Sequence, residues 1–139
     1  MEKEFNLEIL TPGKPLLKTT VSEVVLPAFD GEMGVLPGHE DFIGILGTGA
    51  LKLVKDGDDY WFMVSSGVFE IKKGNLVLLA EFGEDGKNIN DKLALIKVKE
   101  LEPLISNKSL FSDDFAHIKS ELDRAKARLE VHRRTELVN

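Results

Sequence analysis

The chain has 139 residues, no cysteine and a net charge of −6. This length corresponds to one domain, or to one compact domain with an appendage. Without cysteine, a disulfide framework and a cysteine-ligated metal site are excluded, and the negative charge argues against nucleic-acid binding through the overall field. The acidic N-terminus predicts no signal peptide, and no apolar run reaches the ~18 residues of a membrane span.

The charge divides the chain into two parts. Residues 1–87 carry 8 basic and 15 acidic side chains, a net −7, whereas residues 88–139 carry 10 and 9, a net +1. The hydrophobic period changes at the same place, from a strand-like pattern to a helix-like one. We therefore expect a β domain over 1–87 and a helical domain over 88–139.

The first part predicts strands throughout. Phe5, Leu7 and Ile9 alternate as in a half-buried strand. Asp56-Gly57 and Gly74-Asn75 are hairpin signals, and glycine-rich breaks are also expected at 47–49 and 66–67. The expected apolar strands cover 5–10, 22–29, 42–46, 50–54, 60–65, 67–71 and 76–82. Strands at this spacing predict an antiparallel sandwich or barrel.

The segment "GEMGVLPGHEDFIGIL", residues 31–46, holds four glycines, a proline, a histidine and three acids. Glycine permits positive φ, and proline fixes φ and removes a hydrogen-bond donor. The pattern predicts a tightly turned loop that leads into a strand near Phe42. It is either a sharp connection in a β protein or a loop shaped for a partner.

The second part predicts two helices. Asn88 or Asn90 is expected to cap the first, and Pro103 is expected to end or kink it by Glu102. Ser112 is the expected N-cap of the second. The apolar stripes comprise Ala94, Val98, Leu101 and Ile105 in the first, and Phe111, Phe115, Ile118, Leu122, Ala125 and Leu129 in the second. Such stripes suit an antiparallel helical hairpin or packing against another helix.

Residue patterns typical of catalysis are missing from the sequence. His39, His117 and His132 are far apart, and no pair has metal-ligand spacing. No nucleophile elbow, dinucleotide fingerprint or Walker A sequence is present. We expect no catalytic residue, no metal and no cofactor. The second helix is basic, with arginines at 124, 128, 133 and 134, which favours either a solvated face or a surface for an acidic partner.

The sequence resembles the epsilon subunit of F-type ATP synthases of the bacterial type. "GEMGVLPGH" is similar to that family's G-E-x-G-[IV]-L-P-G-H, and "LEILTPGKPL", "GALKLV", "SSGVFEIKKGNLVLLAE" and "AKARL" follow in the family's order. Two departures stand out. Glu40-Asp41-Phe42 replaces Ala-Pro-Leu, and residues 66–71 replace Gly-Gly-Phe-x-Glu-Val.

The resemblance implies an α+β fold, a β-sandwich followed by an antiparallel two-helix hairpin, and a rotor subunit without catalysis. The partners it implies are the gamma subunit, the membrane c-ring and, through the last helix, the alpha and beta subunits, at the cytoplasmic face of the membrane. The hairpin would regulate ATP hydrolysis. The implied contact residues are Glu32, Met33, Gly34 and His39 in the loop, and Arg124, Arg128, Arg133 and Arg134 on the last helix.

Some bacterial relatives bind ATP on the folded hairpin through [IL]-D-x-x-R-A and arginines of the second helix. Here Asn90 replaces the Asp and Leu93 replaces the Arg, whereas Arg124 and Arg128 match. Leu93 offers no donor, and losing one charge-assisted hydrogen bond weakens binding about ten- to a hundredfold. We therefore expect the two arginines to be vestigial ATP contacts, without micromolar binding.

Three hypotheses stay open from the sequence: a rotor subunit, a free-standing β-sandwich binding module with a capping helical tail, and a nucleotide sensor that acts through the hairpin. Co-purification with a rotary ATPase separates the first from the second, and nucleotide titration tests the third.

Overall fold

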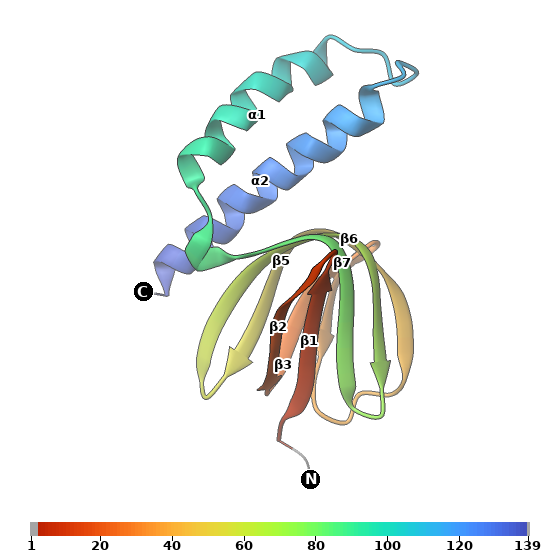
Figure 1. Ribbon diagram of the computed structural model, residues 1–139, viewed down its shortest axis with the longest axis vertical. Coiled ribbons are helices and arrows are strands. Elements are labelled where there is room, and N and C mark those ends of the chain that lie inside the picture. Colours follow the sequence, from red (N-terminus) through yellow and green to blue (C-terminus); the bar gives the residue numbers. More distant parts are fainter. Residues whose placement is uncertain (1–2, 139) are drawn as a thin grey trace.

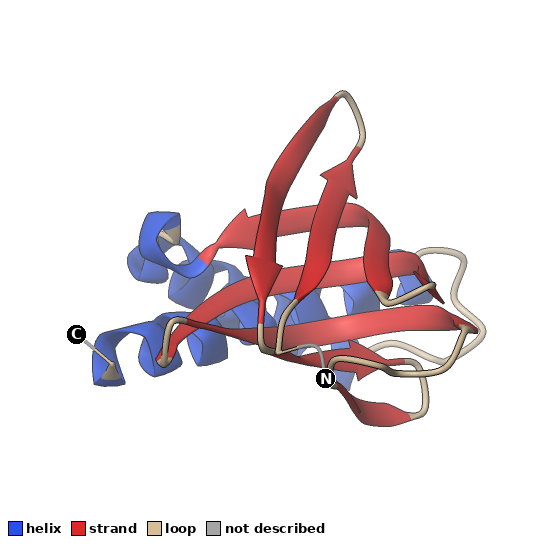
Figure 2. Cartoon of the chain, turned by 90° about the horizontal axis from the view of Figure 1, so that it is seen from below, coloured by secondary structure: helices blue, strands red, loops and turns tan. Residues whose placement is uncertain are grey.

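The structure, a computed structural model that describes residues 3–138, is a β-sandwich with a helical hairpin on one side (Figure 1). Seen from below, the helices lie behind the strands and do not enter the sandwich (Figure 2). The strands are β1 Phe5–Thr11, β2 Lys14–Val21, β3 Glu23–Ala28, β4 Gly31–Val35, β5 Phe42–Lys55, β6 Asp58–Lys72 and β7 Asn75–Asp85. The helices are a short 3₁₀ turn, η1 Gly86–Asn88, then α1 Asp91–Ser106 and α2 Phe115–Leu137.

The strands form one continuous sheet in the order β2-β1-β7-β6-β5-β3-β4, folded over a shared core. All neighbouring strands are antiparallel except β1 and β7, which run parallel. The predicted antiparallel sandwich is confirmed apart from this pair. The parallel pairing joins the first and last strands of the sandwich, so that β1 lies between β2 at the edge and β7.

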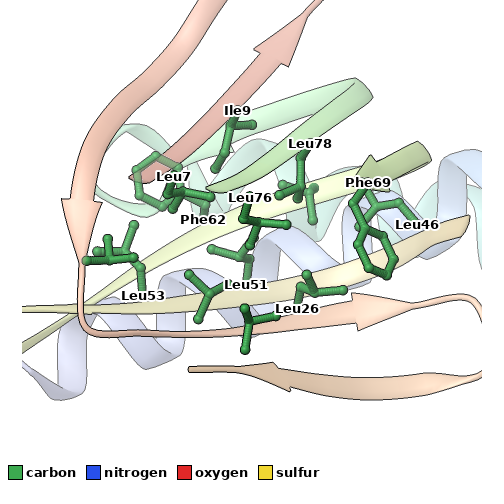
Figure 3. Close-up of a cluster of buried hydrophobic side chains, with 14 of the residues drawn as sticks. Leu7, Ile9, Leu26, Leu46, Leu51, Leu53, Phe62, Phe69, Leu76 and Leu78 are labelled. Carbon is green, nitrogen blue, oxygen red and sulfur yellow. The ribbon is translucent and has the colours of Figure 1, made fainter. Parts of the chain in front are cut away.

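The core confirms the predicted alternation. Leu7 and Ile9 of β1 are fully buried and Phe5 nearly so. Leucines of β3, β5 and β7, together with Phe62 and Phe69 of β6, complete this core in Figure 3. Fully burying one such side chain contributes about 1.5–3 kcal/mol, so the sandwich has its own source of stability.

Two of the predicted strand breaks are wrong. β5 and β6 continue through 47–49 and 66–67. The glycines mark a bend instead of a turn. Ser66 and Gly67 have φ of 58° and 147°, and a Cβ on Gly67 would collide with the Leu79 carbonyl oxygen. Two strands were also missed, namely β2, which is mostly exposed, and β4, which lies inside the expected loop.

The first hairpin turn lies at the predicted Asp56-Gly57 pair, and the second lies one residue earlier than the predicted Gly74-Asn75 pair. Asp56 and Gly57 have φ of 51° and 82°, and Lys73 and Gly74 have φ of 50° and 79°. Positive φ at both central residues is the type I′ geometry that matches the strand twist.

Asn90 is the N-cap of α1, because its side-chain oxygen accepts a hydrogen bond from the Leu93 amide at 3.1 Å. The sequence predicted that Pro103 ends or kinks α1 by Glu102, and the predicted end is wrong. The helix runs to Ser106. Proline in the last turn removes its own amide, but its carbonyl still accepts a bond from the Asn107 amide at 3.2 Å.

The predicted start of α2 is also wrong. Ser112 does not cap the helix, since its carbonyl accepts from the Phe115 amide in a turn that precedes the helix. Asp114 occupies the N-cap position without a side-chain bond. Phe111, placed by the sequence in the apolar stripe, lies outside the helix and is 93% exposed.

α2 buries two stripes. Ile118 and Leu122 pack against Leu101 of α1, as the predicted hairpin requires. A second stripe was not predicted. Ala127 and Val131 pack against Met63 and Ile89, with other sheet residues around them. The hairpin therefore does not rest on its own packing alone, because α2 also docks on the outer surface of β5 and β6.

Candidate interaction surfaces

The segment 31–39 forms an edge strand and a turn. β4 pairs with β3 and has no strand on its other side within the described residues. Gly31 and Gly38 have φ of 134° and 83°, which explains two of the four glycines. Gly34 does not have positive φ, so the left-handed backbone that glycine permits is not used there. Gly44 is needed for space, since a Cβ there would collide with the Phe69 ring.

The four loop residues expected to contact a partner do not form one uniform surface. Glu32 is exposed one residue after the β3–β4 turn, and Gly34 is exposed on the same strand. Met33 packs against the sandwich core. His39 is half-buried and its Nδ1–H donates to the Glu40 carbonyl at 2.7 Å. Glu32 is thus the one charged side chain of this set that faces solvent freely.

The departure at 40–42 has a structural role. The Asp41 carboxylate accepts a hydrogen bond from the Lys73 amide at 2.9 Å, which ties the segment to the β6–β7 turn. Phe42 stacks on Phe69 with ring centroids 5.9 Å apart. These residues hold the end of the segment against the sandwich.

An exposed apolar row crosses the outer surface of β5, β6 and β7. Ile45 pairs with Val68, and Val68 pairs with Leu79, so the three side chains lie next to one another. They are 60%, 45% and 50% exposed, and Ile43 extends the row at 73%. Sequence reasoning missed this row. The available signal was that "FIGIL" and "LVLLA" are apolar at both strand parities, which a sandwich covered on one face alone does not need.

The four candidate arginines make different contacts. The Arg124 guanidinium lies 4.0 Å from the Phe82 ring centroid, and that of Arg134 lies 5.2 Å from the Trp61 ring centroid. Arg128 Nε donates to Glu84 Oε1 at 2.9 Å. Arg133 instead pairs with Glu130 on its own helix. In this conformation three of the four arginines face the chain's own sandwich.

Glu130 is the acceptor for two arginines of α2. Hydrogen bonds from Arg133 and then Arg134, together with their positive charges, hold the pKa of Glu130 below its ordinary value. The same pairing raises the pKa of Arg133. These contacts join neighbouring turns near the end of the helix.

A groove of about 510 Å³ lies where α1 begins, between α1, α2 and β7. Asn90, Leu93, Glu84 and Arg128 are among its lining residues. The Asn90 side-chain oxygen is already engaged as the α1 cap and Arg128 with Glu84. The two arginines expected as vestigial ATP contacts both contact the sandwich: Arg124 lies over Phe82, and Arg128 bonds to Glu84.

Among the residues that the structure describes, no group of three or more His, Cys, Asp or Glu side chains is placed to hold a metal ion. None of the described helices is long and apolar enough to cross a membrane.

Comparison with known proteins identifies the family. Residues 4–86 match the family model "ATP synthase, Delta/Epsilon chain, beta-sandwich domain". An ATP synthase epsilon chain of Nitratidesulfovibrio vulgaris is 36% identical over 132 residues, covering 94% of this chain and 97% of the relative. The chain belongs to the ATP synthase epsilon chain family. It is a non-catalytic central-stalk subunit of a rotary ATP synthase, and is thereby associated with the membrane periphery.

A second epsilon chain and two solved structures are similar along most of the chain. The epsilon chain of Bacillus velezensis is 32% identical over 129 residues, covering 93% of this chain and 97% of that one. A chain of the Euglena gracilis mitochondrial ATP synthase OSCP/F1/c-ring structure superposes with a TM-score of 0.79 at 18% identity, covering 99% and 83%. A chain of the Tetrahymena thermophila mitochondrial ATP synthase central stalk/c-ring structure gives 0.61 at 12%, covering 91% and 95%. These two likenesses extend the shared fold to the helices.

Proposed function

We propose that this subunit couples the gamma subunit to the membrane c-ring through the sandwich, and that its hairpin modulates ATP hydrolysis. The observation that carries the proposal is the exposed apolar row of Ile43, Ile45, Val68 and Leu79. Contiguous exposed apolar side chains on a soluble domain mark an interaction site. The row is the contact surface for gamma.

We infer that the c-ring contact lies at the β3–β4 tip. Glu32 and Phe29 are both exposed there, Phe29 at 79%. The tip combines a charge with an aromatic ring, and aromatic residues are enriched at protein interfaces. In the assembled enzyme this end faces the ring at the cytoplasmic side of the membrane.

The hairpin is the regulatory part of the proposal. Docked on the sandwich it leaves the alpha/beta hexamer free, and released it presents Arg124, Arg128 and Arg134 together with Arg133 to acidic surfaces of the hexamer. Release is required because three of these arginines contact the sandwich when the hairpin is docked.

The gamma contact is tested by a pair of variants with equal exposure. Val68 and Leu104 are each 45% exposed, one in the apolar row and the other on α1. Val68→Asp is expected to lower the affinity of the purified subunit for gamma at least tenfold, because it buries an unpaired carboxylate at the interface. Leu104→Asp is expected to bind normally. Equal binding by both variants would remove the row from the interface.

A further inference from the structure

We propose that the hairpin is held on the sandwich by an arginine latch with Glu84 as its built-in counter-ion, so that docking requires no bound ligand. The arginine latch consists of Arg124, Arg128 and Arg134 of α2, and their sandwich partners are Phe82, Glu84 and Trp61. The proposal concerns the folded chain itself and does not depend on the partners proposed above.

The latch follows from where the arginines lie around α2. The stripe that faces the sheet contains Ala127, Val131 and Thr135, all buried. At about 100° per residue, Arg128 lies at one margin of this stripe and Arg134 at the other, while Arg124 lies in line with the stripe, one turn before Ala127. Charged side chains therefore bracket the apolar contact on both sides.

The buried side chains of this stripe are small, so the contact between α2 and the sheet needs the additional arginine contacts. Alanine, valine and threonine bury little apolar area, so the helix–sheet contact is weak for its length. The aliphatic stems and planar guanidinium groups of arginine cover the aromatic rings next to the stripe. Arg124 over Phe82, at 4.0 Å, is the closer of the two stacked pairs.

Glu84 supplies the charge that Arg128 needs. Arg128 Nε and Glu84 Oε1 are 2.9 Å apart, with side chains 40% and 30% exposed. The pair closes one wall of the groove at the start of α1. The arginine therefore has a carboxylate partner from the chain itself, where an external anion would otherwise be required to neutralise it.

Each latch contact is modest. A partly exposed ion pair or cation–π contact shifts the docking equilibrium about two- to fivefold. The three act on one helix and their contributions multiply when the helix docks as a unit. Because the ion pair is accessible to solvent, its contribution falls as salt rises.

Hydrogen exchange of the full-length chain tests the latch, since exchange reports rare opening even when the hairpin is almost always docked. Glu84→Gln and Arg128→Gln are each expected to speed exchange of the α2 amides at 125–135 about two- to fivefold. The double variant should be no faster than the faster single one. Arg133→Gln is the matched control, because Arg133 pairs within its own helix and not with the sandwich, so its effect on these amides should be smaller than that of Arg128→Gln.

The exchange rates of these variants can contradict the proposal in two ways. Exchange in Arg128→Gln that equals exchange in Arg133→Gln would overturn the latch. Additive effects of the two substitutions, or an effect of Arg128→Gln without one of Glu84→Gln, would overturn the role of Glu84. Raising salt from about 0.05 to 0.5 M should speed exchange in the unmodified chain and have less effect in the double variant.

Discussion

Gly86 provides a direct test of how the hairpin is seated on the sandwich. It is buried in η1, where the sandwich ends and the helices begin. A Cβ at this position would collide with Thr135 Oγ1, and would lie 2.7 Å from the Trp61 carbonyl oxygen and 3.1 Å from Val131 Cγ1. Gly86→Ala therefore forces α2 away from β6, although φ at this residue suits any side chain.

The expected cost is that of overpacking a close contact, about 1–3 kcal/mol. This corresponds to a docking equilibrium about 5- to 150-fold less favourable. Two obstructing atoms belong to α2 and one to backbone that β6 holds in place, so the helix is the element that moves. The sandwich core lies on the other side of the sheet and should keep its stability.

The chain contains no cysteine, so two introduced cysteines carry distance labels without background. Labels at Glu70 and Ser120, both exposed on β6 and α2, report hairpin detachment during urea titration. Gly86→Ala should lower the urea midpoint of detachment, whereas the control Gly34→Ala should not, because its Cβ meets no atom within 4 Å. Equal midpoints for the two variants would refute the reasoning.

Three further predictions follow from the described contacts. Gly34→Val should change the free energy of unfolding by no more than about 0.5 kcal/mol, since Gly34 is exposed and has ordinary φ; thermal denaturation checks this. Calorimetric titration with ATP should show no binding in the low micromolar range, because Leu93 offers no donor; a low micromolar dissociation constant would contradict it. The pKa of Glu130 is lowered by Arg133 and Arg134, so the contribution of this carboxylate to helix stability is present above its unfolded pKa and is lost as pH falls through the lowered folded pKa. Carboxyl NMR titration should find that Glu130 has a pKa below its ordinary value. A pKa at the ordinary value would contradict this prediction.

Alternation and capping chemistry were sufficient to predict much of the fold. Phe5, Leu7 and Ile9 face the core because β1 is covered on that face alone, and the two type I′ turns follow from glycine at the second central position. The cap at Asn90 is equally local, since it requires only the Leu93 amide three residues later.

The wrong predictions concern residues whose role depends on a part of the chain that is distant in sequence. Gly44 and Gly67 resemble turn residues, but both exist to let another part of the chain approach, the Phe69 ring and the Leu79 carbonyl. The second stripe of α2 was hidden because Ala127 and Thr135 are not strongly apolar. Their burial depends on a sheet surface that is distant in sequence.

The candidate surfaces show the same division. The family resemblance implied Glu32 as a contact residue, and the structure shows it exposed on β4 next to the β3–β4 turn. The basic character of α2 could be read directly from the sequence. The sequence did not show that Arg124 and Arg128 contact the sandwich, because Phe82 and Glu84 lie more than 40 residues away. The apolar row escaped notice because its members come from three strands.

The c-ring contact is tested by reversing the charge of Glu32. Glu32→Lys should reduce ATP-driven ion pumping in reconstituted membranes, while the free energy of unfolding of the subunit changes by no more than about 0.5 kcal/mol, as is usual for an exposed substitution. Glu4→Lys is a suitable control, because Glu4 is exposed and immediately precedes Phe5, which pairs with Val21 near the start of β3 and so at the end of β3 opposite the tip. Normal pumping by Glu32→Lys would exclude Glu32 from the contact.

The central claim is that this chain couples gamma to the c-ring, and capture of the tagged full-length subunit from its native membranes tests it most directly. The account predicts that gamma and c subunits are recovered with it in fixed proportion, and that Val68→Asp loses gamma whereas Leu104→Asp retains it. Recovery of the intact, folded subunit without gamma would contradict the account.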